Sequence, residues 1–248
     1  MAQLDDAALY EAFDSDPEPV VAFLQWIATA KQLTPQPQLL DVGCGPGRLF
    51  RPLTDLGWEV VGLEPDAALR ERAAERGRRL GVSVMEGTFN TVAPTKGYDL
   101  IIGINSAFAH VVPPAERADA LLRCRSALRE PGILVLDLPN TLKILFEYRK
   151  PEPQVVSLGD HRVTRTRDHT IDYGAATFVT DERYDVSSPD GYTRTVRKRH
   201  VYAITTWPDL AYLISRAGFS QCEVYDGFTE RAPSNGNGRR LLIVASAT

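Results

Sequence analysis

The sequence predicts an α/β protein with a doubly wound sheet and a small antiparallel β-sheet inserted late in the chain. Three observations predict it. A short apolar run at residues 39–42 leads directly into a glycine-rich turn and then into a helical pattern. Strand and helix patterns continue to alternate as far as residue 138. Between residues 155 and 206 the helical period disappears and β-rich segments replace it.

The core elements follow from apolar patterning and from Gly and Pro at the boundaries. Seven strands are expected, at residues 39–42, 60–63, 82–85, 98–104, 133–138, 221–225 and 241–245. Helices are expected near residues 4–13, 20–28, 48–56, 67–80, 115–128 and 207–216. Together they predict a seven-stranded Rossmann-like sheet with helices on both faces, in which a ligand lies beyond the carboxyl ends of the strands.

The inserted sheet is expected to contain three β-rich segments, at residues 162–171, 175–184 and 192–203. Turn signals separate them, first at residues 172–174 and then at residues 188–191. The chain therefore divides into three parts. Residues 1–140 hold the N-terminal helices and the cofactor-binding part of the core, 141–206 the inserted sheet on the substrate side, and 207–248 the completion of the core.

Composition narrows the classes of function. The chain has 248 residues, 44% of them hydrophobic and 24% charged, and a net charge of −4. This balance offers no broad basic surface for nucleic acid. The basic run Arg197-Lys198-Arg199 is interpreted as a solvated face or as an anchor for an anionic substrate group. Three scattered cysteines predict no disulfide framework, and no apolar run is long enough to span a membrane, so we expect a cytoplasmic protein.

The turn that follows the first strand predicts a nucleoside-cofactor pocket. Gly43, Gly45 and Gly47 allow a sharp turn and let a ligand lie against the main chain, next to the free N–H groups of a helix N-terminus. Glu64, at the tip of the second strand, is placed to accept hydrogen bonds from a ribose diol. The G-x-G-x-G spacing differs from the dinucleotide fingerprint, and no P-loop is present. Asp41 suits a cationic ligand and would repel a pyrophosphate.

Asp41 and the three glycines resemble motif I of the class I S-adenosylmethionine-dependent methyltransferases. The resemblance implies S-adenosylmethionine as the cofactor and Glu64 as the ribose-binding acid. Residues 86–89 resemble the third-strand motif that faces the adenine, although Gly87-Thr88 stands where the family often has an aspartate. The cofactor-binding residues implied are Asp41, Gly43, Cys44 (a small filler in the turn), Gly45, Gly47, Glu64, Thr88 and Phe89. Asn105, directly after the fourth strand, is a further candidate that binds the cofactor or the substrate, or only forms the turn.

Residues 105–110 resemble the corresponding segment of glycine N-methyltransferases and sugar N-methyltransferases. Leu9-Tyr10 resembles an early Leu-Tyr pair of the same enzymes, which implies that the N-terminal helix closes over the cofactor and brings Tyr10 near the methyl group. We expect His110 to act as a base or to orient the acceptor. The function implied is in-line methyl transfer to an N or O atom of a small polar metabolite, such as a sugar, nucleotide-sugar or amino-acid-like acceptor.

The acceptor side is less specific. Asn140, Tyr148 and Arg149 are substrate-side candidates, the last two on a helical stretch expected to border the acceptor pocket. The histidines of the inserted sheet, His161, His169 and His200, lack metal-ligand spacing. We therefore expect them to face solvent, and we expect no metal. A homodimer through the exposed edges of the inserted sheet is a further hypothesis.

Three other classes of function share parts of this pattern. The first is a catalytically inactive S-adenosylmethionine-binding module that acts in regulation or assembly, and the sequence leaves it open. The second is a nucleic-acid methyltransferase, which the acidic balance and the segment Asn105-Ser106-Ala107-Phe108 disfavour. The third is an NAD-dependent oxidoreductase, which the glycine spacing disfavours. Binding of a small-molecule acceptor, without nucleic acid or membrane, is the expected mode of action.

Overall fold

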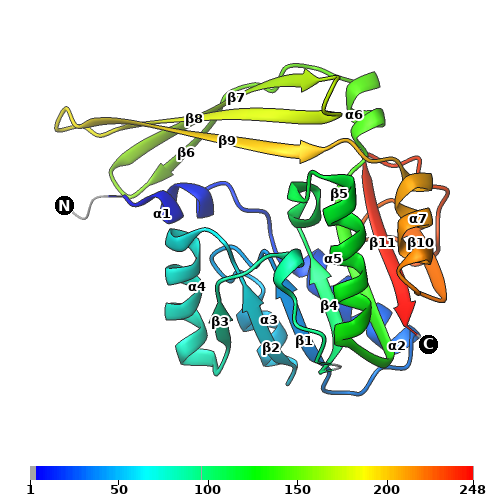
Figure 1. Cartoon of the computed structure of the whole chain (residues 1–248). Helices are drawn as coiled ribbons and strands as arrows, with labels where there is room; N and C mark the ends of the chain where they lie inside the picture. The colour runs from blue at the N-terminus through cyan, green and yellow to red at the C-terminus, as the bar shows by residue number, and fades with distance from the viewer. Residues whose placement is uncertain (1–3, 96, 248) are drawn as a thin grey trace.

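The computed structural model describes residues 4–95 and 97–247 and contains two sheets. The larger sheet has seven strands in the order β10-β11-β5-β4-β1-β2-β3, and only β11 runs antiparallel to its neighbours. This confirms the predicted fold class (Figure 1). In chain order the strands are β1 (Gln38–Val42), β2 (Glu59–Leu63), β3 (Ser83–Met85), β4 (Tyr98–Gly103), β5 (Leu128–Pro139), β10 (Gln221–Tyr225) and β11 (Arg240–Ala247).

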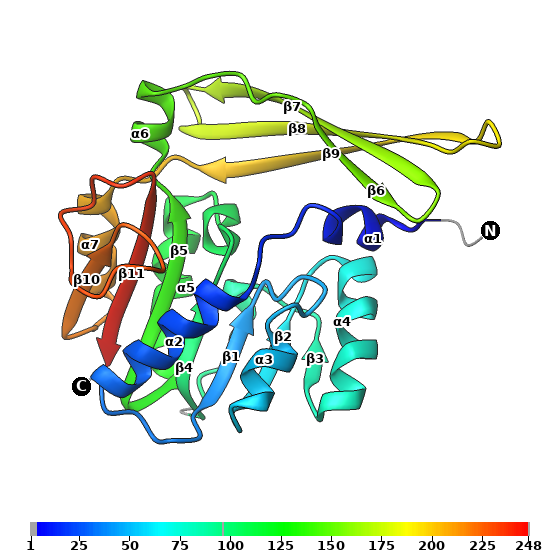
Figure 2. The ribbon, with the colours of Figure 1, turned by 180° about the vertical axis from the view of Figure 1, so that it is seen from behind.

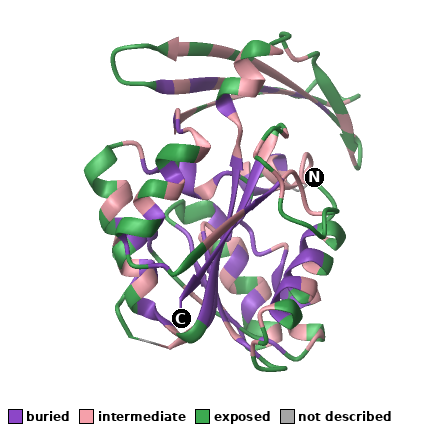
Figure 3. Ribbon diagram, turned by 90° about the vertical axis from the view of Figure 1, so that its right-hand side faces the viewer, coloured by how far each residue is buried: buried purple, intermediate pink, exposed green. Residues whose placement is uncertain are grey.

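Helices cover both faces of this sheet because its central strands are apolar on both sides. Leu39 packs with α2 (Glu18–Ala30) and α3 (Phe50–Asp55) in one core cluster. The adjacent Leu40 packs with α5 (Pro114–Ala127) and α7 (Trp207–Arg216) in the other cluster. Figure 3 shows the resulting band of buried residues along the sheet. No helix in the described ranges is both long enough and apolar enough to cross a membrane.

Local signals set the ends of the helix that follows β2. Helix α4 spans Ala67–Leu80, as expected from the sequence. The side chain of Asp66 caps its first turn by accepting a hydrogen bond from the N–H of Leu69 at 3.0 Å. Gly81, with φ +74°, ends it in the left-handed conformation that favours glycine. This helix runs back from the tip of β2 and so leaves Glu64 at the rim of the sheet.

The fifth strand begins earlier than expected. The sequence placed its start at Ile133, after a turn at Pro131-Gly132, whereas β5 starts at Leu128. Leu128 pairs with Tyr98 and Ile133 pairs with Leu100, so residues 129–132 bulge out between these two pairs. The bulge is the physical reason for the difference, because the strand continues through a segment that has turn-forming residues.

The inserted sheet has four strands, whereas three were expected. They are β6 (Gln154–Leu158), β7 (His161–Asp172), β8 (Thr177–Ser187) and β9 (Thr193–Ala203), and they pair antiparallel in this order. Strand β6 was missed because its five residues are too few to show a clear alternation. The sheet forms a separate layer above the carboxyl ends of the core strands and is joined to the core by α6 (Thr141–Phe146) (Figures 1 and 2). The boundaries proposed for the three parts stay a prediction.

Helix α1 (Asp6–Glu11) lies between the inserted sheet and the core (Figure 2). Leu9, 1% exposed, packs with Val163, Tyr184 and Val186 of the sheet. Arg194 of β9 donates to Asp6 at 2.7 Å. On the core side, α4 holds the same helix through ion pairs from Arg72 to Asp5 and Glu11 and from Arg76 to Glu11. Helix α1 thus connects the inserted sheet to the α/β core, next to the glycine-rich turn.

Candidate active site

A cavity of about 700 Å³ lies at the carboxyl ends of β1, β2 and β4, beneath the inserted sheet. This volume is in the range of small-molecule and cofactor sites. Four groups of residues line it: helix α1 with the loop after it, the glycine turn and its neighbours, the segments after β2, β3 and β4 with the first turn of α5, and strand β9. They include Asp6, Tyr10, Asp14, Asp41, Gly43, Cys44, Gly45, Arg48, Glu64, Asp66, Leu69, Thr88, Phe89, Asn90, Ile104, Asn105, Ala107, His110, Val111, Glu116, Lys198, Arg199 and His200.

The glycine turn closes tightly against the segment that follows β4. Gly43 has φ +74°, and a Cβ atom at this position would lie 2.7 Å from the Cβ of Ala107. Any side chain here would therefore push the two segments apart, in addition to the strain of the left-handed backbone. The N–H of Gly43 donates to the carbonyl of Leu63 at 2.8 Å and ties the turn to β2.

Glu64 is built into the floor of the cavity. Its carboxylate accepts hydrogen bonds from the N–H of Gly45 at 2.8 Å and from the N–H of Asp66 at 2.9 Å. Burial raises its pKa above the usual range, and these two backbone hydrogen bonds oppose that effect. A carboxylate has about four acceptor positions. Two backbone donors therefore leave capacity for the hydroxyl groups of a ribose.

Asp41 is buried and unpaired. It is 2% exposed and has no hydrogen-bond partner among the described residues. Burial raises its pKa to about 7, with repulsion from Glu64 in the same direction and attraction from Arg48 against it. An isolated buried carboxylate is costly unless a cation compensates it. The carboxylate of Asp41 thus suits a ligand that carries a positive charge into this part of the cavity.

Cys44 is buried between the glycine turn and β2. Its Sγ lies 2.9 Å from the point where a Cβ on Gly62 would stand, next to the ring of Phe50. Burial raises the pKa of its thiol, so the thiolate is disfavoured.

Thr88 and Phe89 form the wall beyond β3. Thr88 caps a short 3-10 helix, Phe89–Thr91, by accepting a hydrogen bond from the N–H of Asn90. The ring of Phe89 stands edge-on to Phe108 with centroids 5.0 Å apart. Asn90, which no sequence signal singled out, also lines the cavity and donates to the carbonyl of Glu116 at 3.0 Å. An apolar wall with polar groups at its edge suits a heteroaromatic base.

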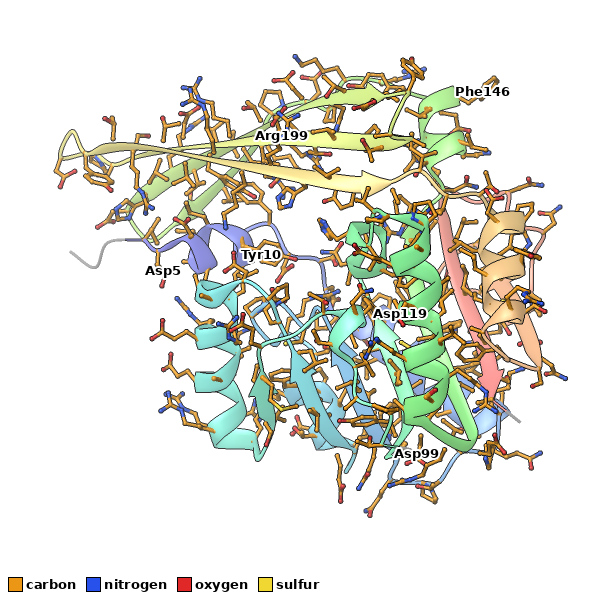
Figure 4. All side chains as sticks on the ribbon, viewed as in Figure 1. Asp5, Tyr10, Asp99, Asp119, Phe146 and Arg199 are labelled. Atoms are coloured by element: carbon orange, nitrogen blue, oxygen red, sulfur yellow. The ribbon has the colours of Figure 1, made fainter. Side chains whose placement is uncertain are left out.

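Tyr10 and Asn105 meet although 95 positions separate them. The amide of Asn105 donates to the hydroxyl of Tyr10 at 3.2 Å, and both residues line the cavity. Burial raises the pKa of Tyr10 above its usual value, and the carboxylate of Asp14 adds to this effect. Figure 4 shows Tyr10 on α1 in the space between the inserted sheet and the core.

His110 stands where the cavity reaches the inserted sheet. Its ring centroid lies 4.6 Å from that of Tyr202 and 5.9 Å from that of His200. Burial lowers its pKa, and the neighbouring His200 acts in the same direction. A histidine in this setting is neutral at pH 7 and can accept a proton.

Two histidines expected to face solvent do not. His200 lines the cavity and lies 3.6 Å from the carboxylate of Glu182, which also accepts a hydrogen bond from Tyr184 at 2.6 Å. His169 contacts the hydroxyl of Thr180 at 2.9 Å. The expectation was wrong because both faces of β7 and β9 carry polar residues, and alternation alone does not show which face is covered.

Lys198 also reaches the cavity from β9, whereas the adjacent Arg197 is exposed. The basic run therefore contributes at least one cation to the acceptor end and is not a uniformly solvated face.

The structure does not bring the three substrate-side candidates to this cavity. Asn140 caps α6 and donates to the carbonyls of Gly236 and Gly238, both at 2.9 Å, so its amide holds a loop. Helix α6 ends at Phe146, before Tyr148 and Arg149. These two residues line a separate hollow at the outer end of the molecule, beside the outward-pointing Phe146 (Figure 4). Within the described ranges no three His, Cys, Asp or Glu side chains gather to form a metal site.

The comparisons with known proteins agree with this geometry. A sequence profile for a methyltransferase domain matches residues 39–132, from β1 to the start of β5. A ubiquinone biosynthesis O-methyltransferase from Roseobacter denitrificans is 27% identical over 176 residues, which cover 68% of this chain and 65% of the relative. The corresponding enzyme of Bradyrhizobium sp. is 31% identical over 107 residues, 42% of this chain and 40% of the relative. The chain thus spans less than two thirds of these relatives.

Solved structures match over nearly the whole chain. A sugar N-methyltransferase from Streptoalloteichus sp. has a TM-score of 0.77 at 18% identity, covering 99% of this chain and 94% of that one. An S-adenosylmethionine-bound amino pentose methyltransferase from Micromonospora echinaspora has a TM-score of 0.73 at 21% identity, covering 100% and 98%. At these identities the likeness establishes the fold.

The family profile over residues 39–132 and the fold over nearly the whole chain agree with the predicted family. The chain contains a methyltransferase domain and has the fold of the class I S-adenosylmethionine-dependent methyltransferases.

Proposed function

We propose that this protein transfers a methyl group from S-adenosylmethionine to an amine nitrogen of a small, sugar-like or amino-acid-like metabolite. One observation carries the proposal: a single cavity is lined both by the glycine turn with Asp41 and Glu64 and by Lys198 and His200 of the inserted sheet. A cofactor bound at the turn and an acceptor beneath the sheet would therefore share this cavity.

The cofactor end has the groups that S-adenosylmethionine needs. Asp41 offers an uncompensated buried carboxylate to the ammonium and sulfonium charges, and Glu64 offers acceptor positions to the ribose. Phe89 and Thr88 would lie along the base. The cofactor, when bound, supplies a methyl carbon that is electrophilic because it is attached to a sulfonium.

The acceptor end has groups that can orient an amine and remove its proton. In the transfer the carbon–sulfur bond breaks as the carbon–nitrogen bond forms, and the electron pair of the broken bond stays on sulfur. The nitrogen then carries one proton too many. The neutral ring of His110, which lines the same cavity, would take that proton, and Tyr10 and Asn105 would contact the ligands between the two ends.

Two points favour an amine over a hydroxyl as the acceptor: the weak basicity of His110 and the names of the structural neighbours. A neutral amine is nucleophilic without a strong base, and the weakly basic His110 suffices for it. The two structural neighbours that match this chain over nearly their full length are named as sugar N-methyltransferase and amino pentose methyltransferase. The curated relatives, named O-methyltransferases, match only part of the chain.

Calorimetric titration tests the cofactor assignment. S-adenosylmethionine and S-adenosylhomocysteine should bind and NAD should not. Glu64→Gln should weaken both sulfur ligands, whereas Glu59→Gln, an exposed residue at the opposite end of the same strand, should leave them unchanged. Failure of both ligands to bind the wild type would refute the proposal.

A paired acceptor screen tests the reaction. Glucosamine against glucose, and glycine against glycolate, compare an amine with the matching hydroxyl, with S-adenosylhomocysteine formation as readout. Turnover on amines supports the proposal, and turnover on hydroxyls alone would refute the amine assignment. Cofactor binding without any turnover in a wider screen of amines would favour a binding module instead.

A further inference from the structure

The turn after β4 has an unusual backbone. Asn105 and Ser106 follow one another with φ +55° and +70°, both in the left-handed region. Neither residue is glycine. Asparagine adopts this conformation occasionally, whereas the side chain of serine makes it unfavourable. Two such residues in succession persist only where the surrounding structure holds them.

Asp137 and Arg240 hold this turn from the neighbouring strands. The carboxylate of Asp137, on β5, accepts the N–H of Asn105 at 2.9 Å. Arg240, at the start of β11, binds the same carboxylate with two nitrogens, at 2.7 and 2.6 Å. Its guanidinium also donates to the hydroxyl of Ser106 at 3.2 Å. The side chain of Asp137 is 5% exposed, so the carboxylate that receives these hydrogen bonds is shielded from water, whereas the side chain of Arg240 is 36% exposed.

The position of the turn decides the shape of the cavity on one side. Ala107, the next residue, packs against Gly43 of the glycine turn. Asn105 itself donates to Tyr10, and the short 3-10 helix that follows, Ala107–His110, carries His110. A change of backbone at Asn105 or Ser106 would therefore displace groups at both ends of the cavity.

We propose that Asp137 and Arg240 are positioning residues for cofactor binding: together they hold the Asn105–Ser106 turn in its left-handed form and so preorganise the cavity. The inference rests on the proposed function, because it takes S-adenosylmethionine as the ligand of that cavity. Neither residue lines the cavity, and both act through the turn.

The expected size of the effect follows from the population of the competent turn. If loss of the pair lets the turn relax, only a fraction of molecules holds the binding form, and the apparent Kd rises by the inverse of that fraction. Relaxation in about nine molecules of ten would weaken S-adenosylmethionine binding roughly tenfold. Arg240→Lys keeps the charge but loses the bidentate geometry, so it should fall between wild type and Arg240→Ala.

The chain contains a matched control at the other end of the same sheet. Arg129 pairs with Asp99 at 3.0 Å, and Asp99 also accepts a backbone N–H, from Gln38 at 2.8 Å. The two pairs have similar side-chain exposure. Arg129 is 41% exposed and Asp99 5%, whereas Arg240 is 36% exposed and Asp137 5%. Figure 4 shows Asp99 at the end of the sheet away from Tyr10. Arg129→Ala should lower the melting temperature to a comparable degree and leave the Kd unchanged.

A second substitution separates positioning from stability. Ser106→Gly makes the left-handed backbone easy to adopt. Added to Arg240→Ala, it should lower the Kd for S-adenosylmethionine at least about threefold and so recover part of the lost affinity. All variants are compared by calorimetry with S-adenosylmethionine and by thermal unfolding without ligand.

The outcomes are distinguishable. No binding by wild type overturns the proposed function. Binding by wild type that stays unchanged in folded Arg240→Ala overturns the positioning role alone. The positioning role is also overturned if Arg129→Ala weakens binding as much, or if Ser106→Gly restores nothing.

Discussion

Binding of S-adenosylmethionine should depend on pH through Asp41, and Asp41→Asn should abolish that dependence. In the free protein this carboxylate is 2% exposed and its pKa is raised to about 7, first by burial and then by Glu64, against the attraction of Arg48. A cationic ligand interacts favourably with the ionised form. Binding therefore requires Asp41 to be ionised, and protons compete with the cofactor.

The magnitude follows from this pKa. At pH 6 roughly one molecule in eleven has the ionised carboxylate, against roughly ten in eleven at pH 8. The apparent Kd should accordingly be about tenfold weaker at pH 6 than at pH 8. At pH 7 binding should release about half a proton, because that share of the protein begins protonated.

The same group should affect stability in the opposite sense. An acid whose pKa is raised by folding destabilises the folded state when it ionises, so stability falls as pH rises from the ordinary value of 3.8 to about 7 and is level above that. The difference corresponds to at most about 4 kcal/mol. Asp41→Asn should therefore raise the melting temperature of the ligand-free protein at pH 8 while it weakens cofactor binding.

Calorimetry in two buffers of different ionisation enthalpy measures both the Kd and the proton release. Repeating it with Asp41→Asn isolates this residue from Glu64, whose pKa is also raised by burial. A wild-type Kd that is equal at pH 6 and pH 8 would refute the reasoning. So would a variant that keeps the wild-type slope.

Three further outcomes are expected. Glu64→Gln removes a charged acceptor at the ribose and should weaken S-adenosylmethionine and S-adenosylhomocysteine equally, by about 1.5–3 kcal/mol in calorimetry; a selective effect on one ligand would contradict a ribose contact. Because burial lowers the pKa of His110, the methylation rate, corrected for the fraction of the acceptor amine that is neutral, should fall on the acid side only below the ordinary histidine pKa of 6.5, and His110→Gln should remove this step from the profile. Leu9→Ala leaves a gap under the inserted sheet and should cost about 2–5 kcal/mol of local stability. The loss should be measured as faster hydrogen exchange in residues 4–13. Unchanged protection would mean that ion pairs, and not Leu9, hold α1 in place.

The fold class and the cofactor end of the site could be predicted from local patterns in the sequence. The strand at residues 39–42, the glycine turn, Asp41 and Glu64 lie close together along the chain, and parallel strands bring their carboxyl ends to one edge. Local patterns of this kind fix geometry because few backbone conformations satisfy them.

The acceptor end, by contrast, depends on tertiary packing. Lys198 and His200 turn toward the cavity because of how the inserted sheet lies on the core, and an alternation with polar residues on both faces does not reveal that. Asn140 is engaged by a loop almost a hundred positions away, which removes it from the cavity. The contacts of Tyr10 with Asn105, and of Asp137 with Arg240, join segments that are equally remote in the chain. Such contacts depend on the packing of whole layers, and no local signal in the sequence encodes them.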